Sequence, residues 1–136
     1  MIISRECDYA VRIIRALMSC EVQPVNEICN NEQIPVQYAY KILKKLTKSG
    51  LIRSHRGRQG GYQLETKLED ITLYDIMVAI NDDLFINACM KPGFNCPLNP
   101  DGKQCGVHKE FCRIQDQIIM ILKEKSIAEI VNFVTL

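Results

Sequence analysis

The chain has 136 residues, of which 47% are hydrophobic and 24% are charged, values typical of one soluble globular domain. No apolar run approaches about 18 residues and no secretory leader pattern opens the chain, so we expect a cytosolic protein that stays out of the membrane. The net charge of +1 hides an asymmetry: residues 1–67 carry 11 Lys and Arg against 6 Asp and Glu, whereas residues 68–136 carry 6 against 10. The basic first half favours a polyanionic partner.

The first predicted element is a helix that runs from a cap at Ser4 to about Cys20. Its apolar residues recur at helical spacing, namely Ala10, Val11, Ile14, Leu17 and Met18. We expect Cys7 to be a small packed thiol. Asp8 has two interpretations, because its carboxylate either favours the positive end of this helix or reaches a partner site.

A helix-turn-helix is predicted next. A short helix from about Val25 to Asn31 is followed by a turn that Pro35 enforces, and a third helix extends from about Val36 to Ser49, before Gly50. One face of the third helix is apolar and consists of Ala39, Ile42, Leu43 and Leu46. The opposite face is polar and carries Gln37, Lys41, Lys44 and Lys48, with Tyr38 and Tyr40 at its flanks. A tight turn before a cationic helix is typical of a DNA-recognition helix.

Two short strands, 51–54 and 62–64, follow at once and predict a hairpin. The loop between them is rich in glycine and carries Arg56 and Arg58, and Ser54 ends the first strand. An arginine-tipped hairpin beside a recognition helix is a wing, and its arginines suit the narrow, electronegative minor groove. The hairpin therefore strengthens the prediction of DNA binding.

Three more helices are predicted in the acidic half of the chain. The first runs from a cap at Thr72 to about Asn81, and a long one runs from about Val107 to Lys125. The long helix has an apolar stripe of Phe111, Ile114, Ile118, Ile121 and Leu122, which we interpret as a dimer seam. A capping box from Ser126 to Glu129 opens a closing helix that covers Ile127, Ile130 and Phe133.

Between these helices lies a segment in which four of the seven cysteines are spaced C-x6-C-x8-C-x2-H-x3-C, from Cys89 to Cys112. It also holds three of the five prolines and three of the seven glycines, so we expect irregular backbone. Thiolates on a loop can converge on one point and suit zinc, copper(I) or an iron–sulfur cluster. The segment is predicted to bind a cofactor.

Other interpretations of the cysteines stay open. Three thiols and His108 could form a closed tetrahedral zinc site with no sensing role. Cys105 and Cys112 could instead pair reversibly in a thiol-based redox sensor, although the chain has no C-x-x-C motif. We predict no enzyme activity, because there is no nucleophile–base pair and no phosphate-cradling loop other than the wing.

The segment IPVQYAYKILKKLTKSGLIRSHRGRQGGYQL, followed by EDITLYDIMVAI, resembles the Rrf2 type of bacterial winged-helix regulators, which includes IscR, NsrR and CymR. The most specific part is the wing motif S-x-R-G-x-x-G-G-Y, from Ser54 to Tyr62, and the resemblance covers nearly the whole chain. It implies a homodimer that binds palindromic promoter DNA, with the long helix crossing between subunits. We expect the protein to act as a repressor.

The resemblance also implies ligands for an iron–sulfur cluster, because cluster-bearing members use three loop cysteines that match Cys89, Cys96 and Cys105. In IscR-like members a histidine at the position of His108 completes a [2Fe–2S] site. In NsrR-like members an aspartate at the position of Asp8, from the other subunit, completes a [4Fe–4S] site. This chain has both residues, and Cys112 is an additional thiol outside the three-cysteine pattern.

We therefore expect a mostly α-helical fold with a β-hairpin wing, organised in one structural domain. Residues 1–82 form the winged helix-turn-helix, residues 83–107 the cysteine-rich loop, and residues 108–136 the dimerisation and closing helices. The expected function is cluster-dependent control of transcription in response to nitric oxide, oxidants or iron.

Overall fold

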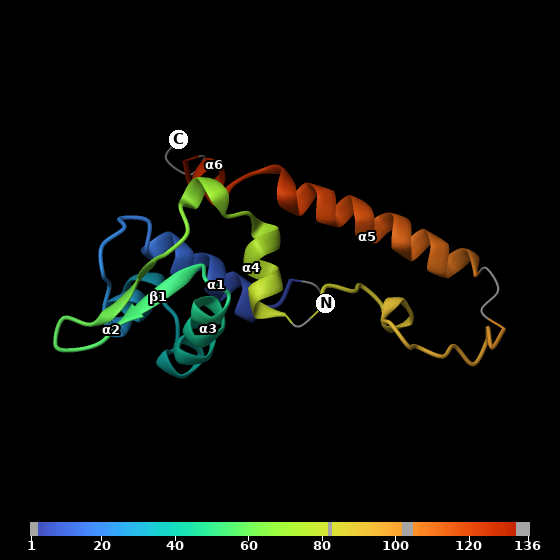
Figure 1. The fold of residues 1–136 in the computed structure, drawn as a ribbon, viewed down its shortest axis with the longest axis horizontal. Helices are drawn as coiled ribbons and strands as arrows, with labels where there is room; N and C mark the ends of the chain where they lie inside the picture. The colour runs from blue at the N-terminus through green and yellow to red at the C-terminus, as the bar shows by residue number, and fades with distance from the viewer. Residues whose placement is uncertain (1–2, 82, 102–104, 133–136) are drawn as a thin grey trace.

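The computed structural model describes residues 3–81, 83–101 and 105–132. Figure 1 shows a body at one end, from which a long arm projects. The body contains α1 (Arg5–Ala16), α2 (Val25–Glu32), α3 (Val36–Lys48), β1 (Ile52–His55), β2 (Gly61–Leu64), α4 (Leu73–Ile80) and α6 (Ile127–Asn132). The arm consists of residues 83–101, Cys105 and α5 (Gly106–Glu124). The predicted mostly helical fold with a two-stranded wing is confirmed.

Helix α1 lies at the centre of the body. Ser4 caps it as predicted, and its hydroxyl accepts a hydrogen bond from the Cys7 amide at 3.3 Å. The predicted end at Cys20 is wrong, because α1 stops at Ala16. Leu17 is fully buried although it lies just after the helix. The run of buried apolar residues is therefore longer than the helix itself. The chain turns here because Gln23 must pair with the returning strand of the wing, where its amide donates to the Tyr62 carbonyl at 2.8 Å.

The helix-turn-helix forms as the sequence predicts. Gln33 closes α2 in the left-handed conformation, with φ of 54°, and Pro35 precedes the first turn of α3. The apolar face of α3 supplies four residues to the core: Ala39, Ile42, Leu43 and Leu46. Its polar face consequently points out of the body.

Strands β1 and β2 pair antiparallel, with Ser54 opposite Tyr62. A single bridge between Gln23 and Tyr62 fastens the hairpin to the segment before α2. Gly61 stands at this junction because a Cβ there would lie 2.2 Å from the Gln23 carbonyl oxygen. Only a residue without a side chain allows the two backbones to approach so closely.

Substituting Gly61→Ala is expected to destabilise the protein by at least about 2 kcal/mol, since the methyl group collides with backbone that cannot rotate away. Thermal unfolding followed by circular dichroism measures the loss. Gly106→Ala is the matched control, because nothing lies within 4 Å of a Cβ built there. Equal melting temperatures for the two variants would contradict the close packing of the wing.

The body is closed by α4 and α6. Thr72 and Asp75 form a reciprocal capping box at the start of α4, and the amide of Ile127 donates to the Ile71 carbonyl at 2.7 Å. Ser126 and Glu129 make the predicted capping box of the closing helix, with the Ser126 amide donating to Glu129 at 2.7 Å. Ile127 is buried as predicted, whereas Phe133 lies outside the described residues.

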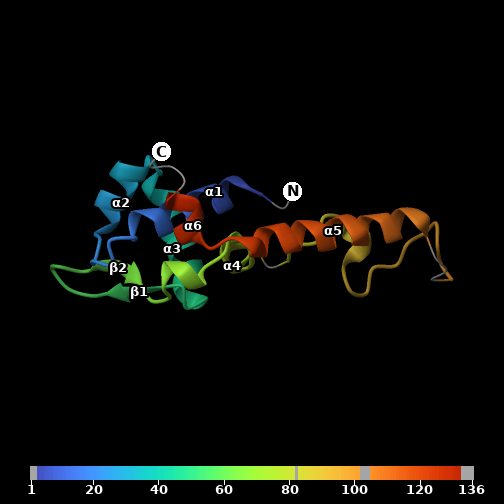
Figure 2. The same ribbon diagram turned by 90° about the horizontal axis from the view of Figure 1, so that it is seen from above.

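The arm is held to the body at its root. Leu122 joins the core, and the ammonium of Lys123 lies 4.2 Å from the centre of the Tyr74 ring on α4. Farther out, the backbone amide of Ile86 donates to the side chain of Gln115 at 3.1 Å, which ties the loop to α5. Figure 2 shows the same projection of α5 and the loop from above. Within the described ranges, no helix combines the length and apolar character needed to cross a membrane.

Candidate DNA-binding face and cysteine arm

The polar face of α3 and the wing enclose a groove. One hollow of about 440 Å³ lies between the wing and the start of α2, and a second of about 550 Å³ lies along α3. The two hollows share Tyr40, Ser54 and Tyr62, so they run into each other. Of the predicted DNA-binding residues, Tyr40, Lys44, Lys48, Ser54 and Arg56 line this groove. Gln37, Tyr38, Lys41 and Arg58 are exposed on the same two elements.

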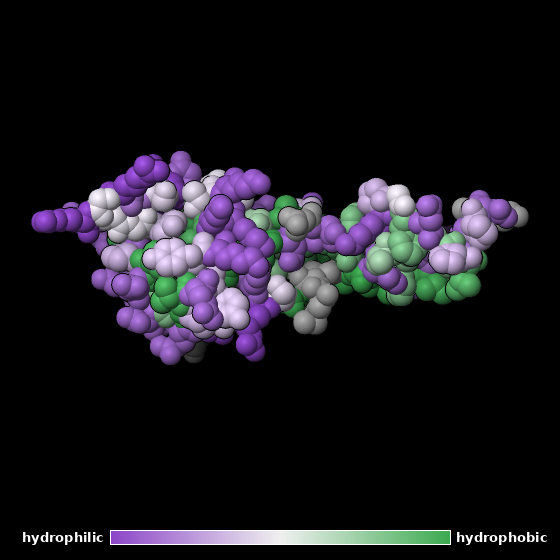
Figure 3. All heavy atoms as spheres, turned by 90° about the horizontal axis from the view of Figure 1, so that it is seen from below, coloured by the Kyte–Doolittle hydropathy of each residue, from purple (hydrophilic) through white to green (hydrophobic). Residues whose placement is uncertain are grey.

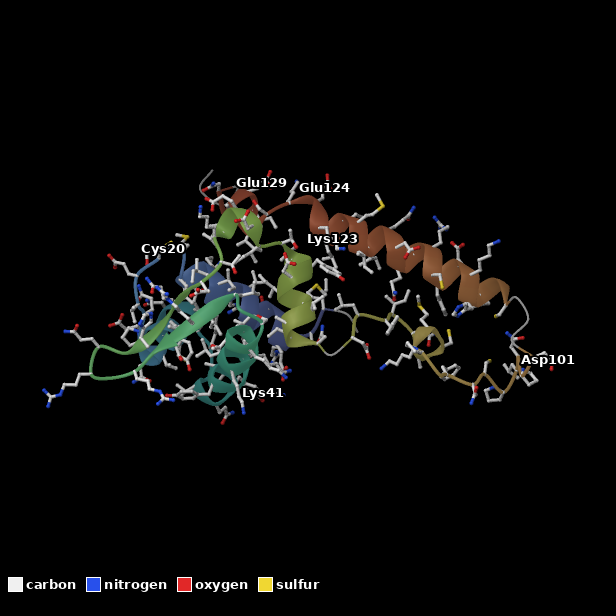
Figure 4. The ribbon with its side chains drawn as sticks, in the orientation of Figure 1. Cys20, Lys41, Asp101, Lys123, Glu124 and Glu129 are labelled. Atoms are coloured by element: carbon white, nitrogen blue, oxygen red, sulfur yellow. The ribbon has the colours of Figure 1, made fainter. Side chains whose placement is uncertain are left out.

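The cations around the groove fall into two groups. Lys44, Lys48, Arg56 and Arg58 are exposed and have no acidic partner among the described residues. Lys41 differs, because its ammonium lies 2.6 Å from the carboxylate of Glu6 on α1. Figure 4 places Lys41 on the body, far from Asp101 near the tip of the arm. Four cations are therefore available to phosphates at once, and Lys41 is already paired.

Two basic residues of the predicted block serve the fold instead. Lys45 donates to the Ile80 carbonyl at 2.8 Å and contacts Glu6 at 3.2 Å. Arg53 donates to Gln63 on the opposite strand and pairs with Glu65 at 3.3 Å. The number of basic residues in the sequence does not distinguish Lys45 and Arg53 from the cations without an acidic partner.

Sequence reasoning missed the first turn of α2, where Pro24, Val25 and Asn26 line the hollow beside the wing. The start of a helix presents unpaired amides and a positive dipole end, which favour phosphate. The predicted helix-turn-helix could have indicated these residues, because the first helix of this motif crosses the DNA backbone.

The four cysteines of the arm are free thiols. Cys89, Cys96 and Cys112 are half-buried and Cys105 is exposed, so all four retain solvent contact. Cys89 lies in a short 3-10 turn, Ala88–Met90, that packs against α5, and Cys105 immediately precedes α5. Over residues 3–81, 83–101 and 105–132, no three Cys, His, Asp or Glu side chains are gathered closely enough to hold a metal ion. The arm thus carries the predicted ligands without bringing them to one point in a single chain.

The two candidates for the fourth ligand lie in different parts of the molecule. His108 is in the first turn of α5, and its Nε2 is 3.5 Å from the sulfur of Cys112, one turn along the helix. Asp8 is exposed on α1, where Arg12 holds its carboxylate at 2.9 Å. His108 therefore shares the arm with the cysteines, whereas Asp8 belongs to the body.

The remaining cysteines divide between core and surface. Cys7 and Cys29 are buried in the core, as expected for Cys7, and burial raises the pKa of the Cys29 thiol. Cys20 is exposed at the turn after α1. Cys7 and Cys29 therefore lie in the body, apart from the candidate metal ligands of the arm.

A helix-turn-helix with an arginine-tipped wing and a cationic groove between them defines a winged-helix DNA-binding protein. The chain belongs to the Rrf2 family, described as iron-dependent transcriptional regulators, whose model matches residues 3–133. A Haemophilus influenzae protein described as an HTH-type transcriptional regulator is 31% identical over 127 residues, which cover 91% of this chain and 82% of the relative.

Solved structures show the same fold. IscR of T. potens superposes with a TM-score of 0.73 at 20% identity and covers 97% of this chain and 87% of its own. CymR, the global cysteine regulator of B. subtilis, superposes with a TM-score of 0.75 at 20% identity and covers 96% of both chains. The chain is thus a transcriptional regulator of this family and not an enzyme.

Proposed function

We propose that the protein is a homodimeric repressor that binds palindromic promoter DNA and responds to an iron–sulfur cluster held on its arm. The observation that carries the proposal is the combination, in one chain, of a cationic DNA-binding groove with an arm that holds four free thiols. The family description as iron-dependent regulators supports it. A cytosolic location follows from the DNA target.

The DNA-binding step uses the two elements that border the groove. Helix α3 enters the major groove with Gln37, Tyr38 and Tyr40 toward base edges, while Lys44 and Lys48 neutralise phosphates. Ser54, Arg56 and Arg58 bring the wing to the neighbouring minor groove. Lys44, Lys48, Arg56 and Arg58 have no acidic partner among the described residues. No internal ion pair must therefore be broken before they bind phosphate, which favours this step.

The donor set of the arm fits an iron–sulfur cluster. Cys89, Cys96 and Cys105 are accessible free thiols, Cys89 on a single 3-10 turn and the other two outside helices and strands, so no long helix would have to unfold to bring them together. The fourth position would be taken by His108 or by Asp8 of the partner subunit, with Cys112 as a further thiol beside His108. When bound, the cluster would supply a centre that nitric oxide, oxidants or iron loss can alter, and a non-thiolate ligand is its weak point.

A second copy of the chain would cover the apolar surface of the arm. Large apolar side chains are exposed along it, with Met120 71%, Ile121 68% and Leu98 94% accessible. Figure 3 shows hydrophobic residues gathered along the arm, whereas much of the body surface in that view is hydrophilic. Helix α5 has 19 residues and so extends roughly 28 Å, long enough to cross a partner helix. Such an unpaired apolar helix face on a soluble regulator indicates an interface.

The same arm can couple the cluster to DNA. It is fixed to the body through Leu122 in the core and through Lys123, which lies over the Tyr74 ring of α4. Because α4 packs against α3, a change in the conformation of the arm would be transmitted to the helix-turn-helix. In a dimer, this would alter the distance between the two α3 helices, which must match half-sites one helical turn apart. A change in the cluster can alter DNA affinity only by as much as it stabilises one distance between the two α3 helices over the other.

Anaerobic purification followed by iron and sulfide analysis, absorption and Mössbauer spectroscopy tests the proposal. We expect a coloured dimer with an iron–sulfur spectrum. A [2Fe–2S] spectrum lost in His108→Ala would identify His108 as the fourth ligand, and a [4Fe–4S] spectrum altered in Asp8→Asn would identify Asp8 of the partner subunit. A colourless protein that contains zinc or no metal would contradict the sensing part and leave DNA binding in place.

A further inference from the structure

Glu6 is an acidic residue that pairs with lysines of the recognition helix. It lies in the first turn of α1, and its two carboxylate oxygens contact two different lysines of α3. One oxygen is 2.6 Å from the ammonium of Lys41, and the other is 3.2 Å from that of Lys45. The hydrogen bond from Lys41 is the main reason that the pKa of Glu6 lies below its ordinary value, so the carboxylate is charged at neutral pH.

The two lysines play different parts in this contact. Lys45 also donates to the Ile80 carbonyl at the end of α4, so three elements converge on its ammonium. A cation at the last carbonyl of a helix is favourable, which keeps Lys45 in place whether or not DNA is bound. Lys41 has no contact of this kind, and 59% of its side chain is accessible. Lys45 therefore anchors Glu6, while Lys41 is free to exchange partners.

We infer that Glu6 is an internal counterion of the recognition helix, which competes with DNA phosphate for Lys41 and thereby lowers the affinity of the protein for DNA. The inference rests on the proposed use of the α3 polar face for DNA. A carboxylate at the position where a phosphate oxygen would lie must be displaced before Lys41 can bind DNA. Once displaced, it keeps its contact with Lys45, so the competition concerns Lys41 alone.

The position of Glu6 gives this competition a second consequence. Glu6 is two residues before Asp8 on α1, and the Lys45 contact links it to the end of α4, from which the arm begins. A shift of α1 or of the arm root would change the distance between Glu6 and Lys41. The strength of the competition, and with it DNA affinity, would follow that shift.

The test measures binding of a fluorescently labelled duplex of mixed sequence by anisotropy, because binding without sequence preference reports the phosphate contacts. Glu6→Gln keeps the shape of the side chain and removes its charge. The matched control is Glu69→Gln, which removes one exposed carboxylate from the turn Leu68–Asp70, beside α6 and away from α3. All variants are purified in the same way and checked for equal secondary structure.

We expect Glu6→Gln to tighten binding by about threefold to fivefold at about 0.1 M salt and Glu69→Gln by less than about twofold. The slope of log affinity against log salt should steepen by about 0.9 for Glu6→Gln, as for one additional phosphate contact. In a Lys41→Met background the gain from Glu6→Gln should vanish, since the contested cation is gone.

Two results would overturn the inference: a gain from Glu6→Gln no larger than that from Glu69→Gln, or a gain that persists in Lys41→Met. The single variants Lys41→Met and Lys44→Met separate this failure from failure of the proposed function. If Lys41→Met weakens binding while Glu6 has no special effect, only the counterion role is wrong. If Lys41→Met leaves binding unchanged, Lys41 does not contact DNA and the counterion role is again wrong. The DNA-binding role of the α3 polar face is wrong as well only if Lys44→Met, which removes a cation of the groove, also leaves binding unchanged.

Discussion

Replacing Cys96 with Ala is expected to abolish the iron–sulfur cluster and leave a colourless, folded dimer. Cys96 is a half-buried free thiol in the middle of the arm loop, and it lies outside regular secondary structure. Its removal therefore deletes a ligand without disturbing a helix or the core. With only two of the three loop thiolates left, the site cannot retain a cluster at anything near its original affinity.

Cys20→Ala is the matched control for this variant. Cys20 is also a free thiol, but it is exposed at the turn after α1, on the body. Iron and sulfide per chain, measured on anaerobically purified protein, should fall to background for Cys96→Ala and stay at the original level for Cys20→Ala. Full iron and sulfide in Cys96→Ala would exclude Cys96 as a ligand.

Replacing Arg56 with Ala is expected to weaken operator binding by about 1–3 kcal/mol, which is roughly fivefold to 150-fold. Arg56 lies in the turn of the wing, lines the groove beside α3 and has no partner among the described residues. Its guanidinium is therefore available to the minor groove, where negative potential is concentrated. The fold should be unaffected, because the side chain is exposed.

The affinity of Arg56→Ala is measured at fixed salt on an operator that the protein selects from random-sequence DNA. Lys67→Ala removes an equal charge from an exposed position after the wing, at the cap of the turn Leu68–Asp70. It should lower affinity by much less, since only the general attraction to DNA is reduced. Equal losses in the two variants would remove the wing from the DNA interface.

Local patterns predicted most of the body. Helical spacing of apolar residues located α2, α3, α4 and α6, and the glycine-rich turn located the wing. These features depend on neighbours in sequence, and the capping boxes at Thr72 and Ser126 are of the same kind. The end of α1 was missed because the bridge from Gln23 to Tyr62, a contact between distant residues, determines where the chain leaves the helix.

The parts of the site that the sequence did not predict are likewise made by distant residues. Glu6 meets Lys41 and Lys45 across 35 and 39 positions, and Gln115 meets Ile86 across 29. No local pattern encodes such pairs, so the separation of free cations from paired ones required the structure. The cysteine spacing identified the arm thiols, but it did not predict their separation in the described part of the chain, where no three candidate metal ligands come together.

The most direct test of a cluster-dependent repressor compares DNA affinity before and after loss of the cluster in one preparation. Anaerobic protein is titrated onto its selected operator, the cluster is removed by nitric oxide or chelation while its absorption is followed, and the titration is repeated at the same salt concentration. Coupling between the arm and α3 predicts that Kd changes by about fivefold or more as the absorption disappears. No such change is expected in Cys96→Ala treated in the same way. An unchanged Kd despite complete loss of the cluster would contradict the sensing function.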